Sequence, residues 1–469
     1  MAEVLHAKKA CTVNPLKMSQ PLGGALATMG VRGAMPLFHG SQGCTSFGLV
    51  LFVRHFREAI PLQTTAMSEV ATVLGGYENV EKAVLTIAER TKPEIIGICS
   101  TGVTETKGDD VEGFIRLIRE KHPELDHIKL VYVSTPDFEG AFQDGFGKTV
   151  KRMVEVLVDA PEAEAPRDAA KIAVLPGCHL TPGDLDELRD IIEAFGLNPV
   201  FLPDISGSLD GHIPEDFTPT TLGGVGVDEI AALGDATLAI AVGEQMRPAA
   251  EALEAKTSVP FRLFDRLTGL LAVDELISCL MEITGKPVPR KIKRQRGQLV
   301  DAMLDGHFSL GGRKIAIGAE PDLLWTLGAT LADMGCEISV AVTTTHSPVL
   351  ARMPCAEVVI GDLEVFETRA KTAEVELLIT HAHGRQAAER LGLPLYRAGI
   401  PIFDRLGAAH ITTLGYRGTR DLIFDVGNIF MADTHEPTPE TWISERGAEN
   451  LTGLGEETRD GAGSAVAAH

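Results

Sequence analysis

The fold class is decided by residues 171–202, which read KIAVLPGCHLTPGDLDELRDIIEAFGLNPVFL. Lys171–Leu175 has the short, continuous apolar pattern of a buried strand. Across 185–195 the apolar residues fall at helical spacing, and Gly196 is placed to end that helix. Residues 199–202 then predict a second strand. The stretch therefore predicts a strand–helix–strand unit.

The same unit recurs near both ends of the chain. The expected strands are 94–99, 129–133, 314–317 and 337–342. A helix over 323–334 joins the later pair, and Asp109–Asp110 can cap the helix that joins the earlier pair. Apolar strands alternating with helices indicate parallel sheets that are covered on both faces. The sequence therefore predicts an α/β fold with three Rossmann-like domains, each a parallel sheet flanked by helices.

Composition shifts suggest where these domains meet. An acidic, Pro-bearing stretch covers 161–167, and a basic segment covers 287–298. We expect the domains at 1–165, 166–298 and 299–446, followed by a flexible Gly-, Ala- and Glu-rich tail at 447–469.

Charge and cysteine usage exclude several classes of protein. The formal net charge is 43 − 65 = −22, so nucleic acid and anionic membranes are poor partners. The basic run 290–296 is typical of a solvated helix face or a linker.

No apolar run approaches the ~18–20 residues of a membrane span, and Met1–Lys9 lacks the apolar core of a signal peptide. Seven cysteines without a CxxC pair do not indicate a disulfide framework. We expect a cytoplasmic protein.

Two glycine-rich motifs fail as nucleotide-binding loops. Gly147–Lys148–Thr149 resembles the end of a phosphate-binding loop, but the glycine required five places earlier is Phe142. Gly223–Gly226 lacks the spacing of a dinucleotide-binding fingerprint. Both segments are expected to be ordinary loops.

The histidine-bearing loops are ambiguous. His381 and His383 follow a predicted strand, where a packing role or a polar pocket is more typical than a metal site. Cys178–His179 could ligate a metal or form a structural loop. Asp404 and Arg405 could pair to lock a loop.

Cys44 has a different setting. It follows an apolar strand and two glycines, Gly40 and Gly43, and it precedes a helix expected over 45–57. A helix N-terminus favours the thiolate, which is the form that binds iron. An iron–sulfur cluster usually needs about four thiolates. If a cluster binds at Cys44, another subunit must supply most of its ligands.

The chain resembles the nitrogenase component 1 family from about Thr12 to about Phe430. The residues that carry the resemblance are Leu16–Gly23, His39–Cys44, Arg54–Glu58, Gly75–Gly76, Gly108–Asp110 and Gly399–Gly407. The first blocks are highly specific, whereas Gly108–Asp110 alone is weak.

The resemblance also suggests which branch of the family is concerned. The catalytic β-type subunit carries three cysteine ligands to its cluster, and the matching places here hold Ser19, Cys44 and Gly102. One surviving thiolate resembles the branch that assembles the iron-molybdenum cofactor. There a [4Fe-4S] cluster bridges two subunits, and the partner supplies three cysteines. Cys44 is thus the metal-ligating and cofactor-binding residue that the resemblance implies, with no catalytic residue.

The implied function is a cofactor-assembly scaffold rather than a stand-alone enzyme. With a NifE-like subunit the chain would form an α2β2 heterotetramer. That complex would receive an iron-sulfur precursor of the iron-molybdenum cofactor from NifB. It would mature the precursor with molybdenum and homocitrate, with the NifH iron protein acting in trans. The alternatives are a catalytic β-type subunit of nitrogenase, a nitrogenase-like reductase acting on a tetrapyrrole, and a nucleotide-dependent α/β enzyme.

Overall fold

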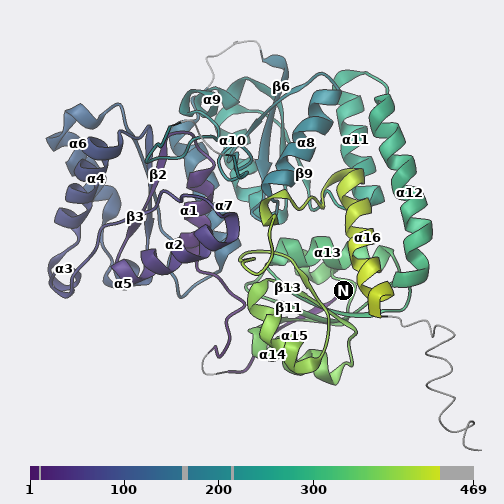
Figure 1. Ribbon diagram of the computed structural model, residues 1–469. Helices are drawn as coiled ribbons and strands as arrows, with labels where there is room; N and C mark the ends of the chain where they lie inside the picture. The colour runs from purple at the N-terminus through teal and green to yellow at the C-terminus, as the bar shows by residue number, and fades with distance from the viewer. Residues whose placement is uncertain (10–11, 161–166, 213–215, 434–469) are drawn as a thin grey trace, which may run out of the picture.

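A computed structural model describes residues 1–9, 12–160, 167–212 and 216–433. It contains three parallel sheets, each flanked by helices (Figure 1). The α/β fold class predicted from the apolar strand–helix–strand units is confirmed. The expected tail at 447–469 lies outside the described residues. None of the described helices is long and apolar enough to cross a membrane.

The first unit carries the four-stranded sheet β3-β2-β4-β5. Its elements are α1 (Gln20–Met29), β2 (Ala34–His39), α2 (Gln42–Phe56), β3 (Gln63–Thr64), α3 (Glu69–Leu74), α4 (Tyr77–Thr91), β4 (Ile95–Ser100), α5 (Gly102–Lys107), α6 (Val111–Lys121), η1 (Pro123–Leu125), β5 (Lys129–Val133) and α7 (Phe142–Leu157). Every residue of β2 and β4 is buried, as expected of central strands covered on both faces.

The second unit carries the four-stranded sheet β7-β6-β8-β9. Its elements are β6 (Asp168–Pro176), α8 (Pro182–Ala194), β7 (Asn198–Phe201), α9 (Val227–Ala231), η2 (Ala232–Asp235), β8 (Ala236–Val242), η3 (Glu244–Met246), α10 (Arg247–Thr257) and β9 (Phe261–Phe264). Two long helices follow, α11 (Leu270–Thr284) and α12 (Arg290–Leu310). The basic run 290–296 forms the first two turns of α12 and is mostly exposed.

The third unit carries the six-stranded sheet β1-β12-β11-β10-β13-β14. Its elements are β1 (Glu3–His6), β10 (Lys314–Ala319), α13 (Pro321–Asp333), β11 (Glu337–Thr343), η4 (Pro348–Arg352), β12 (Glu357–Ile360), α14 (Leu363–Thr372), β13 (Leu377–Thr380), η5 (Ala382–Gly384), α15 (Arg385–Leu391), β14 (Leu395–Arg397), η6 (Ala408–His410) and α16 (Gly415–Asp433). Helix α16 returns to pack along α12 (Figure 1).

The domain limits expected at 165 and 298 remain predictions, and two features bear on them. The first sheet unit does not contain the N-terminus, because β1 pairs in parallel with β12, with Glu3 opposite Glu357. The limit at 298 falls inside α12, which is continuous. The three sheets otherwise follow one another along the chain as expected.

Candidate functional site

Cys44 lies in the first turn of α2. Strand β2 ends at His39, Ser41 is the N-cap, and the helix begins at Gln42, three residues earlier than the sequence predicts. The Ser41 hydroxyl lies 3.7 Å from the Cys44 Sγ. Cys44 is a half-buried free cysteine. The thiol is therefore held at a helix start and remains reachable from outside the chain.

The loop that precedes Cys44 lies against the loop that follows β4. A Cβ atom on Gly40 would lie 2.1 Å from the Thr101 hydroxyl oxygen, so only glycine fits there. That hydroxyl donates a 3.0 Å hydrogen bond to the His39 carbonyl. Gly102 follows as the first residue of α5. The carboxyl ends of β2 and β4 therefore lie at the same edge of the sheet. This edge carries Cys44 and Gly102, two of the three positions that match the cysteine ligands of the catalytic β-type subunit.

Ser19 occupies the third position that matches a cysteine ligand of the catalytic β-type subunit, and it is the N-cap of α1. Its neighbour Gln20 donates to the Pro136 carbonyl in the loop that follows β5, at 3.0 Å. The amide of Gly102 donates to Asp137 of the same loop, also at 3.0 Å. The three places therefore surround one edge of the first sheet, where parallel sheets commonly bind ligands.

Cys44 is the one partly exposed cysteine that the structure describes at this edge. Among the described residues, no group of three or more His, Cys, Asp and Glu side chains is arranged to hold a metal ion. Neither Ser19 nor Gly102 carries a thiol, and Cys11 lies outside the described residues. The residues present fit a cluster that receives one ligand from this chain and the others from elsewhere. They do not fit a cluster held by this chain alone.

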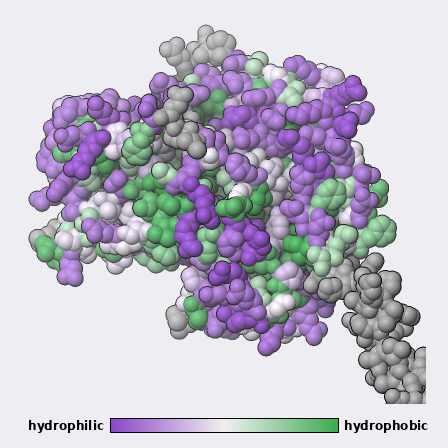
Figure 2. Space-filling view, viewed as in Figure 1, coloured by the Kyte–Doolittle hydropathy of each residue, from purple (hydrophilic) through white to green (hydrophobic). Residues whose placement is uncertain are grey.

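Apolar side chains surround the exposed face of α2. Phe47, Val50 and Val53 follow one another at helical spacing and are 61%, 52% and 39% exposed, and Val103 of α5 is 38% exposed. We name these four residues the α2 patch. Figure 2 shows hydrophobic residues gathered over this part of the molecule. Exposed apolar side chains gathered near a reachable thiol are typical of a protein interface.

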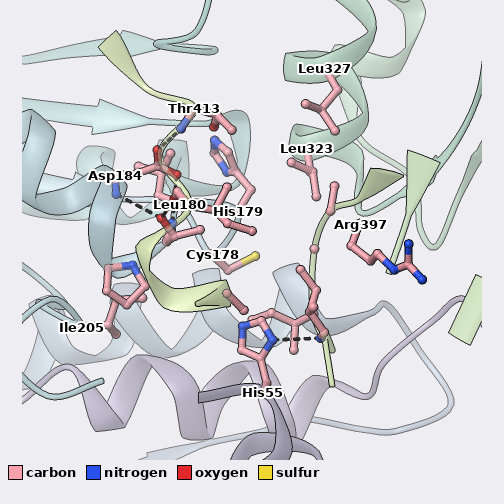
Figure 3. Close-up of a pocket in the computed structure, with 18 of the residues that line it drawn as sticks. His55, Cys178, His179, Leu180, Asp184, Ile205, Leu323, Leu327, Arg397 and Thr413 are labelled. Carbon is pink, nitrogen blue, oxygen red and sulfur yellow. Dashed lines mark hydrogen bonds between the residues drawn. The ribbon is translucent and has the colours of Figure 1, made fainter. Parts of the chain in front are cut away.

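A second candidate site is a cavity where the three units meet (Figure 3). Its free space is about 60 Å³, which is enough for a few water molecules. His55 of α2, Cys178 and His179 after β6, and the end of β14 with residues 398–400 after it contribute to its walls. The carboxyl ends of strands from two sheets and the end of α2 therefore converge here.

The two histidines of the cavity wall are neutral. Burial lowers the pKa of His55 to about 4, and its Nδ1 accepts the Ile402 amide at 2.9 Å. Burial also lowers the pKa of His179 to about 4, and its Nε2 is buried without a hydrogen-bond partner among the described residues. The Arg397 guanidinium points away from His179 (Figure 3) and pairs with Asp404 at 2.8 Å. Asp184 also lines the cavity, and its carboxylate accepts two backbone amides at 2.7 and 2.9 Å. The walls therefore present polar groups, most of them hydrogen-bonded, in an apolar surround.

A polar network beside the cavity joins the three units. The backbone and side-chain amides of Gln245 both donate to Asp322 Oδ2 at 3.0 Å. The Asp322 amide donates to Gln143 of α7 at 3.2 Å. The Cys178 amide donates to the Gln245 side-chain oxygen at 3.3 Å. Asp322 is fully buried, and this burial raises its pKa to about 6.

Two expectations for individual motifs need correction. Gly147–Lys148–Thr149 is not a loop but lies inside α7, where a Cβ atom on Gly147 would lie 2.8 Å from the Gln245 carbonyl. The glycine therefore serves close packing of a helix. Asp404 pairs with Arg397 and not with its neighbour Arg405. Gly223–Gly226 is a loop, as predicted.

The histidine pair after β13 is held by backbone contacts. His381 is buried, its Nε2 lies 3.0 Å from the Leu16 carbonyl, and its Nδ1 accepts the His383 amide at 3.3 Å. Both nitrogens of His381 are therefore occupied by the chain itself. Sequence reasoning missed the Leu16 contact, because its two partners are separated by most of the chain.

Comparisons with known proteins identify the same family as the sequence motifs. The family model described as nitrogenase component 1 type oxidoreductase matches residues 19–431. The chain is 64% identical to the nitrogenase iron-molybdenum cofactor biosynthesis protein NifN of Bradyrhizobium diazoefficiens, over 97% of each chain. It is 54% identical to NifN of Mesorhizobium japonicum, over 94% of this chain and 95% of that one.

The solved structure described as nitrogenase Cp1 at pH 6.5 superimposes with a TM-score of 0.87 at 31% identity, covering 93% of this chain and 97% of that chain. The sequence match and the structural match each span nearly the whole chain. The chain belongs to the nitrogenase component 1 family.

Proposed function

We propose that this chain is one subunit of a scaffold on which the iron-molybdenum cofactor of nitrogenase is assembled. Its two reported relatives carry the name of a cofactor biosynthesis protein and match it over nearly their full length. In this role the chain pairs with a NifE-like subunit in an α2β2 heterotetramer. An iron-sulfur precursor delivered from NifB gains molybdenum and homocitrate there, with the NifH iron protein acting in trans.

The single observation that carries the proposal is the setting of Cys44. Its thiol is reachable at the start of α2, while the other two ligand places hold Ser19 and Gly102. The chain therefore donates one thiolate to a [4Fe-4S] cluster whose remaining ligands come from the partner. Bound there, the cluster would supply one-electron transfer between the partner proteins and the maturing precursor. No ligand of molybdenum or homocitrate is assigned to this chain.

The chain's own residues prepare this site in two ways. Gly40 allows the ligand loop to lie directly against Thr101, which fixes the direction in which α2 starts. The α2 patch supplies apolar surface that a partner covers, which removes water from around the thiolate. A dry surround strengthens the electrostatic influence of nearby groups on the cluster.

A catalytic β-type subunit of nitrogenase is the second candidate function. The 31% identity and TM-score of 0.87 to a nitrogenase component favour the family as a whole. The absence of thiols at Ser19 and Gly102 argues against this candidate. A chain with one of the three thiolates cannot hold its share of the larger cluster in the usual way.

The test is iron content and low-temperature EPR of the chain co-expressed with its NifE-like partner. Cys44→Ala should lose iron and the signal of a reduced [4Fe-4S] cluster. Cys355→Ala is the matched control, because Cys355 is also half-buried but its thiol donates to the Glu357 carbonyl in the third unit. Full iron and an unchanged spectrum in Cys44→Ala would refute the proposed ligand.

A further inference from the structure

A buried hydrogen-bonded network lies directly behind the loop that carries Cys44. The His39 side chain is completely buried at the end of β2. Its Nδ1 lies 3.1 Å from the Thr65 hydroxyl, and its Nε2 lies 3.2 Å from the Asp109 carboxylate. Lys107 completes the network with a 3.1 Å ion pair to Asp109. We name Thr65, His39, Asp109 and Lys107 the His39 network.

The contact with Asp109 settles the direction of the hydrogen bonds. A carboxylate paired with Lys107 can only accept, so His39 carries its proton on Nε2 and donates it to Asp109. In this neutral ring Nδ1 accepts from the Thr65 hydroxyl, whose oxygen accepts the Gly40 amide at 3.1 Å and which also lies 3.5 Å from the Gly40 carbonyl. Burial lowers the pKa of His39, against the opposing effect of Asp109, which favours this neutral form. The network therefore runs from the first amide of the ligand loop to a buried carboxylate.

Two sequence blocks of the family that the proposed function leaves unexplained belong to this network. Asp109 comes from the Gly108–Asp109–Asp110 block. Gly76 comes from the Gly75–Gly76 block, and a Cβ atom on it would lie 2.6 Å from His39 Cε1 and 2.7 Å from the Asp109 carboxylate. The glycine thus makes room for the contact between the imidazole and the carboxylate. Four segments, around residues 39, 65, 76 and 107–109, therefore form one structural unit behind Cys44.

We propose that His39 and Asp109 are positioning residues for the cluster bound at Cys44. They fix the Gly40–Cys44 loop through Thr65, and they place a buried negative charge behind the thiolate. This inference rests on the proposed function. A network that only stabilises the fold would hold the loop in the same way, but it would leave the reduction potential of the cluster unchanged.

Electrostatics gives the direction of the effect. A cluster that gains an electron becomes more negative, and a buried carboxylate close by opposes that gain. Asp109 is 6% exposed, so water screens it poorly. Asp109→Asn keeps a hydrogen-bond acceptor for His39 but removes the charge, and it leaves the Lys107 cation unbalanced. Both changes shift the midpoint potential upward.

The first experiment is an EPR-monitored redox titration of the complex with the NifE-like partner. Asp109→Asn should keep its iron and show a higher midpoint potential than the unsubstituted complex. Asp110→Asn is the matched control: it removes the same charge one residue away, from an exposed side chain that caps α6 through the Gly113 amide. Asparagine caps helices as well as aspartate. Equal potentials in Asp109→Asn and Asp110→Asn would overturn the charge role.

The second experiment needs no cluster and covers the case in which Asp109→Asn does not assemble. Hydrogen exchange at the Gly40 amide is measured in the full chain. Thr65→Val removes the hydroxyl that accepts this amide, and exchange should accelerate about fivefold. Thr65→Ser keeps the hydroxyl and should restore protection. Equal exchange in Thr65→Val and Thr65→Ser would overturn the positioning role.

Cys44→Ala in the same complex separates the two proposals. If it keeps its iron, the proposed ligand is wrong, and the exchange experiment still decides whether the network positions the loop. If it loses its iron while Asp109→Asn and Asp110→Asn titrate alike, the proposed function stands and the charge role of Asp109 fails.

Discussion

Asp322 should make the free energy of unfolding fall as the pH rises from about 4 through about 6. Its carboxyl is fully buried at the junction of the three units, where Oδ2 accepts two amides of Gln245 and Oδ1 has no partner among the described residues. Burial raises its pKa from 3.8 to about 6. Between pH 3.8 and about pH 6 the Asp322 carboxyl is therefore mostly protonated in the folded state and mostly ionised in the unfolded state. The contribution of this group to the free energy of unfolding is therefore largest below pH 3.8 and is lost as the pH rises through about 6.

The magnitude follows from the two pKa values. Between pH 5 and pH 8 the folded carboxyl releases its proton, while the unfolded one is ionised throughout. The free energy of unfolding should therefore drop by about 1.4 kcal/mol over that interval because of this group. Asp322→Asn keeps an acceptor for Gln245 and presents an uncharged NH₂ group where Oδ1 lies. The variant should lack this part of the pH dependence.

The assay is urea unfolding of the full chain at pH 5 and pH 8, followed by circular dichroism. The difference between the two pH values should be smaller in Asp322→Asn by about 1.4 kcal/mol. Asp228→Asn is the control, because Asp228 is exposed in the first turn of α9. Every other titrating group contributes equally to the pH dependence of unfolding in the substituted and the unsubstituted chain. If the free energy of unfolding falls by the same amount between pH 5 and pH 8 in Asp322→Asn and in the unsubstituted chain, Asp322 does not hold a proton in the folded state at pH 5.

Three further substitutions test the packing and the interface. Gly23→Ala would place a Cβ atom 1.9 Å from the Phe142 carbonyl between α1 and α7, and this overpacking should lower the free energy of unfolding by about 3 kcal/mol in urea titrations. Gly297→Ala, in the open middle of α12 with no atom within 4 Å of its Cβ position, should instead raise it by about 0.8 kcal/mol. Phe47→Glu puts a charge on the α2 patch, and the fraction of a NifE-like partner that co-purifies should fall; unchanged recovery would remove this patch from the interface.

The sequence predicts most of the sheet cores because their signal is local. Strand β5 occupies the predicted residues 129–133, and β4 begins and ends one residue after its predicted limits. Apolar runs flanked by glycine carry that information without reference to the rest of the chain. Strand β1 is missed for the opposite reason. Its four residues, Glu3–His6, show no periodicity, and they become a strand only through pairing with β12.

The candidate site likewise combines features that the local sequence predicts with contacts that it does not predict. The position of Cys44 at the start of a helix follows from the strand, the two glycines and the helical spacing around it. The contact between His39 and Asp109 spans 70 residues, and no spacing rule connects a strand end to the residue before a helix cap at that distance. The Arg397 partner of Asp404 is closer in sequence, but the choice between Arg397 and Arg405 depends on where the chain turns after β14. Long-range contacts of this kind require the folded structure.

The pairing of β1 with β12 has a consequence for how the chain is made. Glu3–His6 leaves the ribosome before its partner Glu357–Ile360, which follows about 350 residues later. At cellular rates of elongation, roughly 20–70 s of synthesis separate the two strands. During that time the first two sheets can form, but the third cannot recruit its edge strand. Glu3–His6 must therefore remain without its partner strand until Glu357–Ile360 has been translated, and a fused segment that captures Glu3–His6 early should delay completion of the last sheet.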